Sequence, residues 1–402
     1  MHTRHDFRHR LAVSGRVQAC LVSVLVVVTV AACSSSGSSS GGSSAAGSTT
    51  SGGTQTASCD IGPAQAAVAA GMQQPTFTPP GPAFDAKKAA GKSVVSIPQL
   101  INPFNEGNEN AMAAVSKLVG VKFKQFVNSG TVTQYVQGFD QALANGANGI
   151  DLFGADARQL QPQISAAHAK GVVVTASQTY DNTQVASVLP TLHVNAMTTW
   201  PYQETGKLFA DWIIADSHCH ADVSMIYDPG DVPATAVLVG AMKAEFAKLC
   251  PQCKLSSNLV SVFDWSTKLQ STVQSAIVKD PNINYMVPIY DAMTQWVDPA
   301  IIAAGKAKQI KVVSCSGTPS ALTLIKNGGP LAMDIGTSAT WEGYAVMDNM
   351  LRLLTGNKPL TVQNYPIRIF TKANVNLALP NPDAAFGTSF VAGYKKLWEL
   401  SS

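Results

Sequence analysis

The sequence carries almost no net charge, and its small positive excess lies in one short segment. The formal charge of +3 arises in the N-terminus, from Arg4, Arg8, Arg10 and Arg16 against Asp6. The rest of the chain is formally neutral. It therefore has no basic footprint for nucleic acid or for anionic lipid.

Motifs that mark common catalytic sites are also missing. The chain has no Gly-rich phosphate loop, no Gly-x-Ser-x-Gly elbow and no His-Glu-x-x-His helix. Asp228 and Asp231 form a pair within an Asp-Pro-Gly-Asp turn, which is typical of a solvated loop. Asp228 follows a strand, so lining a cleft remains its alternative role. We expect no enzyme activity, no metal and no cofactor.

No apolar run reaches the length of about 20 residues that spans a membrane comfortably. Residues 1–33 instead have the order of an export signal, with a basic start, an apolar run at 19–32 and small residues at the exit. Val30-Ala31-Ala32-Cys33 resembles the bacterial lipobox, which predicts a lipoprotein signal peptide and lipidation at Cys33. An uncleaved anchor that ends in a buried Cys is the alternative.

Two segments with little capacity to bury a core follow the signal. Residues 34–58 are almost entirely Ser, Gly, Thr and Ala, a composition that predicts a flexible, disordered tether. Residues 59–91 contain the run Pro79-Pro80-Gly81-Pro82, and we expect a leader that packs loosely against the first domain.

Five cysteines remain beyond the signal and the lipidation site, namely Cys59, Cys219, Cys250, Cys253 and Cys315. Outside the membrane, disulfides are permitted. Cys219 and the Cys250/Cys253 pair precede strands that would be neighbours, so we predict a disulfide of Cys219 with Cys250 or Cys253. A zinc site with His218 and His220 is the alternative, although its ligands are crowded. Cys315 is predicted to be a buried, free thiol.

From residue 92 the chain alternates strands with amphipathic helices, twice over. The first set of expected strands is 93–97, 121–126, 148–153, 171–176 and 191–194. The second set is 223–227, 254–262, 283–289, 311–315 and 331–335. Helices are expected between them. Regular β-α alternation indicates an α/β fold of two lobes, each built on a doubly wound parallel sheet.

The first strand leads into a turn that has the outline of a binding site. The turn contains Asn102, Phe104 and Asn105 and opens the next helix. Ligands of open α/β sheets bind at the carboxyl ends of the strands. The amides and the flat apolar ring suit a polyhydroxylated or cyclic small molecule. An ordinary Asn-Pro turn that only starts a helix is the alternative.

Residues 92 to about 375 resemble the periplasmic sugar-binding proteins of ABC transporters, the ribose- and galactose-binding group. The resemblance rests on the order of several motifs: Asn102-Pro103-Phe104, Asp156, the strand 171–175, the segment 288–293, the segment 312–319 and the tail 371–375. It implies a type I periplasmic binding protein fold with ligand in the cleft between two lobes.

The resemblance also implies three crossovers between the lobes, near Asn195, Gly336 and Pro366. The N-terminal lobe then comprises residues 92–195 plus 337–365. The C-terminal lobe comprises residues 196–336 plus 366–402.

Site positions of the family map onto this chain one at a time, and several depart from the family pattern. Ser177 and Gln178 stand where Asp-Arg is usual, Ser316 replaces an Asp, and Tyr290 replaces the Asn before Asp291. Trp265 keeps a frequent aromatic position, Val239 falls where an Arg is expected, and Thr337 stands where Gln or Asn is common. The loss of charge predicts an uncharged, partly apolar ligand.

These observations predict a lipid-anchored solute-binding protein on the outer face of the bacterial cytoplasmic membrane. It would bind a small molecule as a monomer and present it to an ABC transporter permease. A receptor that reports to a membrane sensor and, less favoured, an enzyme on the same fold are the alternatives. A transcription regulator would need a helix-turn-helix where the signal and tether lie.

Overall fold

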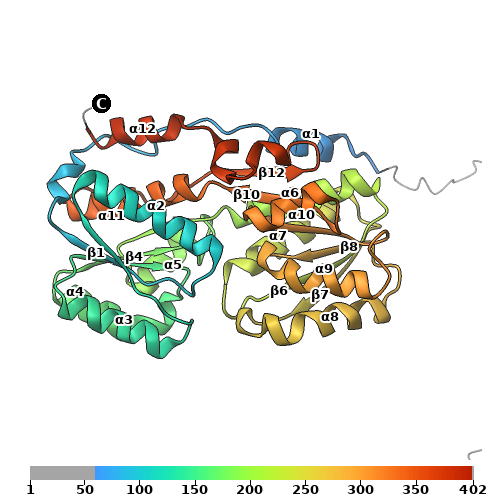
Figure 1. Ribbon diagram of the computed structural model, residues 1–402, viewed down its shortest axis with the longest axis horizontal. Coiled ribbons are helices and arrows are strands. Elements are labelled where there is room, and N and C mark those ends of the chain that lie inside the picture. Colours follow the sequence, from blue (N-terminus) through green and yellow to red (C-terminus); the bar gives the residue numbers. More distant parts are fainter. Residues whose placement is uncertain (1–58, 401–402) are drawn as a thin grey trace, which may run out of the picture. The chain divides into compact units, whose positions relative to one another are not determined.

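The computed structural model describes residues 59–400, and their strands form two six-stranded sheets (Figure 1). The predicted signal (1–33), the lipidation site Cys33 and the tether (34–58) lie outside these residues. Within 59–400, no helix combines the length and the apolar character needed to cross a bilayer.

The first sheet is parallel throughout and has the order β11-β5-β4-β3-β1-β2. Its strands are β1 (Ser93–Ser96), β2 (Lys122–Gln125), β3 (Gly149–Phe153), β4 (Val173–Ser177), β5 (Ala196–Thr199) and β11 (Gln363–Asn364). Its helices are α2 (Pro103–Val119), α3 (Val132–Ala144), α4 (Gln161–Ala169), α5 (Val185–Leu192) and α11 (Ala339–Leu354). The central strand β3 is buried along its whole length, because helices cover both faces of a parallel sheet.

The second sheet has the order β12-β10-β9-β8-β6-β7, and only β12 runs antiparallel to its neighbour. Its strands are β6 (Asp222–Tyr227), β7 (Lys254–Leu259), β8 (Tyr285–Pro288), β9 (Lys311–Ser316), β10 (Leu331–Thr337) and β12 (Ile367–Thr371). Its helices are α6 (Tyr202–Ser217), α7 (Ala234–Leu249), α8 (Trp265–Lys279), α9 (Thr294–Ala303) and α10 (Pro319–Asn327). The predicted fold class is therefore confirmed.

One predicted strand, 191–194, is wrong. Helix α5 continues to Leu192, and His193 ends it in the left-handed conformation, with φ 54°. The strand β5 starts only at Ala196 and pairs with β4. The N-terminal lobe therefore continues past residue 195, and the first crossover lies at Trp200 and Pro201.

The other two crossovers lie close to the expected positions. The second follows β10 at Ser338, two residues after Gly336, and leads into α11, which packs against α2. The third lies at Tyr365 and Pro366, between β11 of the first sheet and β12 of the second.

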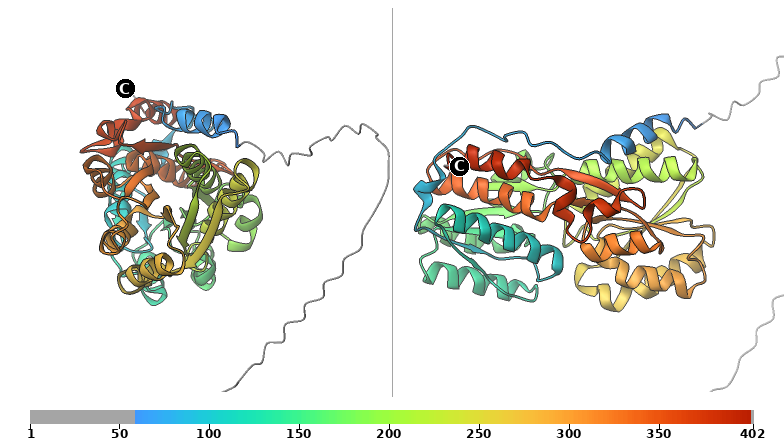
Figure 2. Two further views of the ribbon diagram at one scale, coloured as in Figure 1. Left: turned by 90° about the vertical axis from the view of Figure 1, so that its right-hand side faces the viewer. Right: turned by 45° about the horizontal axis from the view of Figure 1, so that its top comes forward.

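The leader packs tightly and contacts both lobes, which differs from the loose packing that we expected. Its helix α1 (Gly62–Gly71) packs against α6 and β12 of the second lobe. Further on, Phe84 is buried, and the guanidinium of Arg352 on α11 of the first lobe lies 4.5 Å from the centre of its ring. Figure 2 shows the leader running beside the C-terminal helix α12 (Ser389–Leu397).

The C-terminal tail also returns to the first lobe, although the sequence placed all of 366–402 in the second. Trp398 stacks on Tyr344 of α11, with ring centres 5.3 Å apart, and its indole donates a hydrogen bond to Asp348 over 2.7 Å. The buried pair of Asp348 and Arg352 completes this contact. β12 starts beside the end of β10 and runs away from the crossover, so the segment after Thr371 brings the chain back to α11.

The disulfides differ from the predicted pairing. Cys59 bonds to Cys219, and Cys250 bonds to Cys253. The packing of α1 on α6 brings the start of the leader to the end of α6, a proximity that the cysteine spacing does not reveal. Cys315 is free and buried, as predicted. Among residues 59–400, the one grouping of potential metal ligands consists of sulfurs from these two disulfides.

The buried leader makes a prediction about stability. We expect Phe84→Ala to lower the free energy of unfolding by about 3–5 kcal/mol, because it leaves a cavity beside Arg352 and α11. Chemical denaturation measures the change. Val278→Ala is the control, since Val278 is 83% exposed, and it should change stability by no more than about 0.5 kcal/mol. Equal, small effects of both substitutions would contradict the packing of the leader.

Candidate functional site

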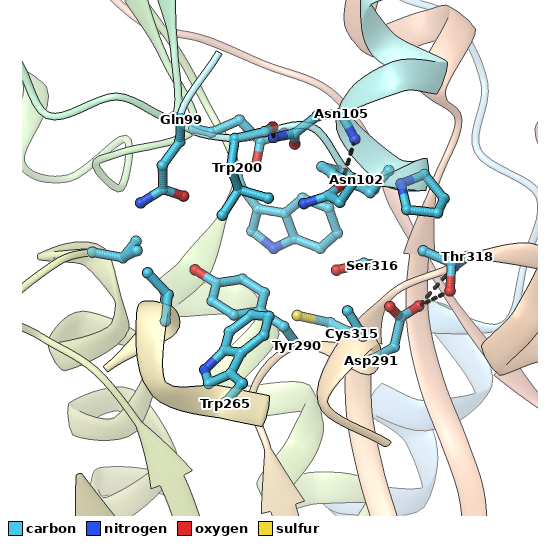
Figure 3. A pocket seen from close by; sticks show the side chains of 18 of the residues that line it. Gln99, Asn102, Asn105, Trp200, Trp265, Tyr290, Asp291, Cys315, Ser316 and Thr318 are labelled. Atoms are coloured by element: carbon cyan, nitrogen blue, oxygen red, sulfur yellow. Dashed lines mark hydrogen bonds between the residues drawn. The ribbon is translucent and has the colours of Figure 1, made fainter. Parts of the chain in front are cut away.

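A cavity of about 520 Å³ lies between the two lobes, where the parallel strands of both sheets end (Figure 3). Residues that follow β1, β3, β4 and β5 line it from the first lobe. Residues that follow β6, β7, β8 and β9 line it from the second lobe. This is the edge where parallel α/β sheets bind ligands.

Eight of the ten predicted site residues line this cavity: Asn102, Phe104, Asn105, Gln178, Trp265, Tyr290, Asp291 and Ser316. Ser177 and Thr337 do not. The hydroxyl of Ser177 points into the first lobe and donates to Asp151, while that of Thr337 donates to the carbonyl of Pro366. Val239 is buried in α7 and also lies outside the cavity lining. That the eight residues bind a ligand stays a prediction.

The start of α2 presents amide groups to the cavity. The side-chain oxygen of Asn102 caps the helix by accepting the backbone N–H of Asn105 at 2.8 Å. The Asn105 side chain donates in turn to the carbonyl of Leu100. An Asn amide has separate donor and acceptor atoms, so Asn102 keeps its nitrogen, and Asn105 its oxygen, for a ligand.

A chain of aromatic side chains connects the two lobes along the cavity. The rings of Trp265 and Tyr290 lie 6.1 Å apart, and the hydroxyl of Tyr290 lies 3.2 Å from that of Tyr202. Trp200 continues the chain, 6.3 Å from Tyr202 and 6.4 Å from Phe104. Flat apolar faces of this kind pack well against rings and hydrocarbon groups.

The turn after β9 is held by a buried carboxylate. One oxygen of Asp291 accepts hydrogen bonds from the backbone N–H and the hydroxyl of Thr318, at 2.7 and 2.9 Å. Gly317 in this turn has φ 75°, and a Cβ there would lie 2.5 Å from Gly336. Only glycine therefore permits this close approach. The turn sets Ser316 at φ 135°, directly at the cavity.

Gln178 connects the cavity to all three crossovers. It adopts a left-handed conformation, with φ 70°. Its carbonyl accepts the hydroxyl of Tyr202, and its side-chain nitrogen donates to Glu342 and to the hydroxyl of Tyr365. Tyr202 follows the first crossover, Glu342 follows the second, and Tyr365 lies in the third. A ligand that contacts Gln178 therefore touches the residue on which the three connections converge.

The cavity contains no fixed positive charge. No Lys, Arg or His belongs to its lining within residues 59–400. Its one carboxyl group is that of Asp291, and burial raises the pKa of this group to about 7. Behind the cavity, burial raises the pKa of Glu342 to about 8, so this group is largely protonated at neutral pH. An anionic ligand would find no counter-charge here and would lose its hydration without compensation.

The lobes also touch at the rim of the cavity. The Arg158 guanidinium donates to the carbonyl of Gly230 across the lobes, at 3.1 Å. Phe263 lies against Gly130. A Cβ added at this glycine would lie 2.9 Å from the Phe263 ring. Asp228 acts as a brace for this loop, because its two oxygens accept backbone N–H groups of Gly230, Asp231 and Val262. Asp228 does not line the cavity.

Sequence reasoning missed several residues of the lining, including Gln99, Trp200, Tyr202, Cys315 and Thr318. Tyr202 was missed because the fifth strand was placed several residues too early, and for Trp200 a packing role was favoured over a place at the cleft. With β5 ending at Thr199, an aromatic residue directly after a strand is a usable signal. Gln99 lies three residues before Asn102, and Thr318 lies two residues after Ser316. Each follows the end of a strand, so the expectation that ligands bind at the carboxyl ends of parallel strands also covers these two residues.

Two α/β lobes, three crossovers and a cavity between the lobes define a two-lobed binding protein. Residues 93–358 match the family model of the periplasmic binding protein domain. The chain belongs to this family, as the sequence resemblance implied. No curated protein sequence gives a match to the chain.

Solved structures with the same fold include an ABC transporter solute-binding protein from Agrobacterium vitis with bound allitol. The two sequences are 18% identical, and the TM-score is 0.61. The match covers 71% of this chain and 97% of the Agrobacterium vitis protein. A 5-methylthioribose transporter solute-binding protein from Thermotoga lettingae, in complex with 5-methylthioribose, is 17% identical, with a TM-score of 0.61 and coverage of 77% and 94%. The glucose-galactose binding protein GanP from Geobacillus stearothermophilus is 15% identical, with a TM-score of 0.63 and coverage of 72% and 99%.

The buried Glu342 makes a prediction about pH. Burial raises its pKa in the folded protein from 4.5 to about 8, so the folded state holds a proton that the unfolded chain releases. Stability is therefore lost as the pH rises through this window, by at most about 1.4 kcal/mol per pH unit for one group. Glu342→Gln resembles the protonated form and should lose less stability between pH 6 and pH 9 than the wild type.

Thermal unfolding of both proteins across this range measures the difference. Other buried acids with raised pKa values, such as Glu109 and Asp298, are present in both proteins and contribute a shared slope. The difference between the two stability curves should become constant below the unfolded-state pKa of 4.5, where Glu342 is protonated in both states. Parallel curves from pH 5 to pH 9 would contradict a protonated Glu342 in the folded state.

Proposed function

We propose that this protein is an extracytoplasmic solute-binding protein of an ABC importer, and that it binds a small, uncharged, sugar-like or cyclic molecule between its lobes. The observation that carries the proposal is the lining of the cavity, which combines free amide groups with aromatic faces and has no cation. Such a surface matches hydroxyl groups and ring faces and offers nothing to an anion. Binding occurs without turnover.

The solved structures of the same fold support this ligand class. The ligands bound in two of them, allitol and 5-methylthioribose, are neutral molecules that carry several hydroxyl groups. At identities below 20% these structures share only a fold with this chain, so the chemistry of its own cavity carries the choice of ligand class.

A panel of neutral sugars, polyols, amino acids, organic acids and amines tests the ligand class. We expect a rise in melting temperature with one or more sugars or polyols, because a ligand that binds only the folded state stabilises it. Differential scanning fluorimetry measures the shift. A response to acids or amines alone would contradict a neutral ligand and leave the binding-protein fold untouched.

Substitution of Asn102 tests whether the ligand binds at this residue. The ligand used is the compound that raises the melting temperature most in the panel. Asn102→Ala and Asn102→Ser both remove the amide, and each should weaken binding by about 1–3 kcal/mol. Ser still caps α2, so only the Ala variant should also lose about 1 kcal/mol of stability. Titration calorimetry and denaturation separate the two effects. Binding by Asn102→Ser with unchanged affinity would show that the amide makes no contact with the ligand.

We also propose that Cys33 carries the lipid that holds the protein at the outer face of the bacterial cytoplasmic membrane. The lipobox resemblance and the Ser/Gly composition of 34–58 support this. There the protein, as a monomer, would deliver its ligand to a membrane permease. This delivery rests on the family's association with transport.

The Cys33→Ser variant tests the anchor. We expect it to lose incorporated fatty-acid label and to move into the soluble or secreted fraction, because lipidation needs the thiol. Fractionation and metabolic labelling in a bacterial host measure both properties. Cys20→Ser, within the same signal, is the matched control and should keep the label. A Cys33→Ser protein that stays labelled and in the membrane would refute lipidation there.

A further inference from the structure

The second lobe lines one wall of the cavity. This wall is polar near the end of β9 and apolar near the ends of β6 and β7. The sheet order places β9 on one side of β8, and β6 and β7 on the other. Ser316 and Thr318 follow β9, whereas Val232 follows β6, and Val262 and Trp265 follow β7. The end of β8, with Tyr290 and Asp291, lies between the two ends of the cavity.

The β9 end carries polar side chains on both of its walls. Figure 3 shows Asn102 and Asn105 of the first lobe above Ser316 and Thr318 of the second. The Oδ1 atom of Asp291 is buried at this end and has no hydrogen-bond partner within the described residues. A buried acceptor of this kind stabilises a ligand that donates a hydrogen bond to it. Hydroxyl groups are therefore matched here.

At the opposite end the wall of the second lobe is apolar. Figure 3 shows Trp265 and Tyr290 together on this side, with Gln99 as the labelled amide of the first lobe near them. Val232 and Val262 complete this part of the lining. A hydroxyl group against the two valines and the indole face would lose water and gain few hydrogen bonds, whereas a hydrocarbon group would gain from burial.

The cavity is also larger than one sugar ring requires. Its volume is about 520 Å³, and one sugar ring fills only part of such a space. A ring held at the polar end would leave the Trp265 end unfilled. Volumes of about 300–1,000 Å³ are typical of sites for larger, drug-sized molecules.

We propose that the ligand is amphipathic: a polyhydroxylated part at the Asn102 and Ser316 end carries an apolar or aromatic substituent that packs against Trp265, Val232 and Val262. This inference rests on the proposed function and narrows its ligand class to a glycoside or a similarly substituted polyol. Trp265 is the residue that sets the preference for the substituent.

Matched pairs of glycosides test the proposal. The methyl and phenyl glycosides of D-glucose, D-galactose, D-ribose and D-arabinose are titrated calorimetrically into the wild type, Trp265→Ala, Trp265→Phe and Trp296→Ala. For each sugar that binds, we expect the phenyl glycoside to bind at least tenfold more tightly than the methyl glycoside to the wild-type protein. The quantity compared between variants is this ratio of affinities, so a general loss of binding does not imitate the effect.

In Trp265→Ala the ratio should fall to within threefold of one, and Trp265→Phe should keep most of it, because an aromatic face remains. Trp296→Ala removes a tryptophan of the same lobe that does not line the cavity, and its ratio should equal that of the wild type. Equal affinities for methyl and phenyl glycosides, or a ratio that survives Trp265→Ala, would overturn the amphipathic ligand and leave the neutral sugar-like class intact. Binding of none of these glycosides, together with no response to any neutral compound by thermal shift, would overturn both proposals.

Discussion

The hydrogen bonds of Gln178 join the cavity to the segments that connect the two lobes. Its carbonyl holds Tyr202, and its amide holds Glu342 and Tyr365, so one residue at the end of β4 contacts a residue in or just after each crossover. Its left-handed backbone and buried partners keep this geometry in place. A ligand that displaces Gln178 also disturbs its hydrogen bonds to residues at the crossovers. Ligand binding at Gln178 is therefore coupled to the relative arrangement of the two lobes.

Buried cations are scarce among residues 59–400, and this scarcity has two consequences. Carboxyl groups such as Glu109, Asp298 and Glu342 are buried away from cations, and burial raises the pKa of each. Folding therefore favours their protonated forms, which makes acidic to neutral conditions the more stabilising range. In the cavity the same lack of cations selects against anionic ligands. Its shape and its aromatic and amide groups then decide which neutral molecules fit.

Two segments outside the matched family region strengthen the connection between the lobes. The leader begins at the Cys59–Cys219 disulfide beside α6 and reaches Phe84 under α11. The tail returns from β12 to α11, where Trp398 stacks on Tyr344. Each segment spans both lobes and thus adds a connection to the three crossovers. Opening of the cleft must accommodate all of these connections, whose buried aromatic contacts resist separation.

Local patterns in the sequence predicted the two-lobed α/β fold and the first turn of the candidate site, whereas the family resemblance implied the other site positions, such as Gln178, Trp265 and Tyr290. Buried strands such as 149–153 are recognised as mainly apolar runs. The turn after a parallel strand lies at the edge of the sheet where ligands bind, independently of the other elements of the fold. Asn102, Phe104 and Asn105 were found in this way.

The tertiary structure decided what depends on contacts between distant segments. Residues 191–194 were predicted as a strand, but α5 extends to Leu192, and the pairing of β4 with β5 brings Trp200 to the cavity. Cys59 meets Cys219 because α1 packs on α6. Ser177 and Thr337 adjoin the site in the sequence, yet their hydroxyls donate to Asp151 and Pro366. Side-chain direction and long-range partners are set by packing across the whole fold, which local periodicity does not encode.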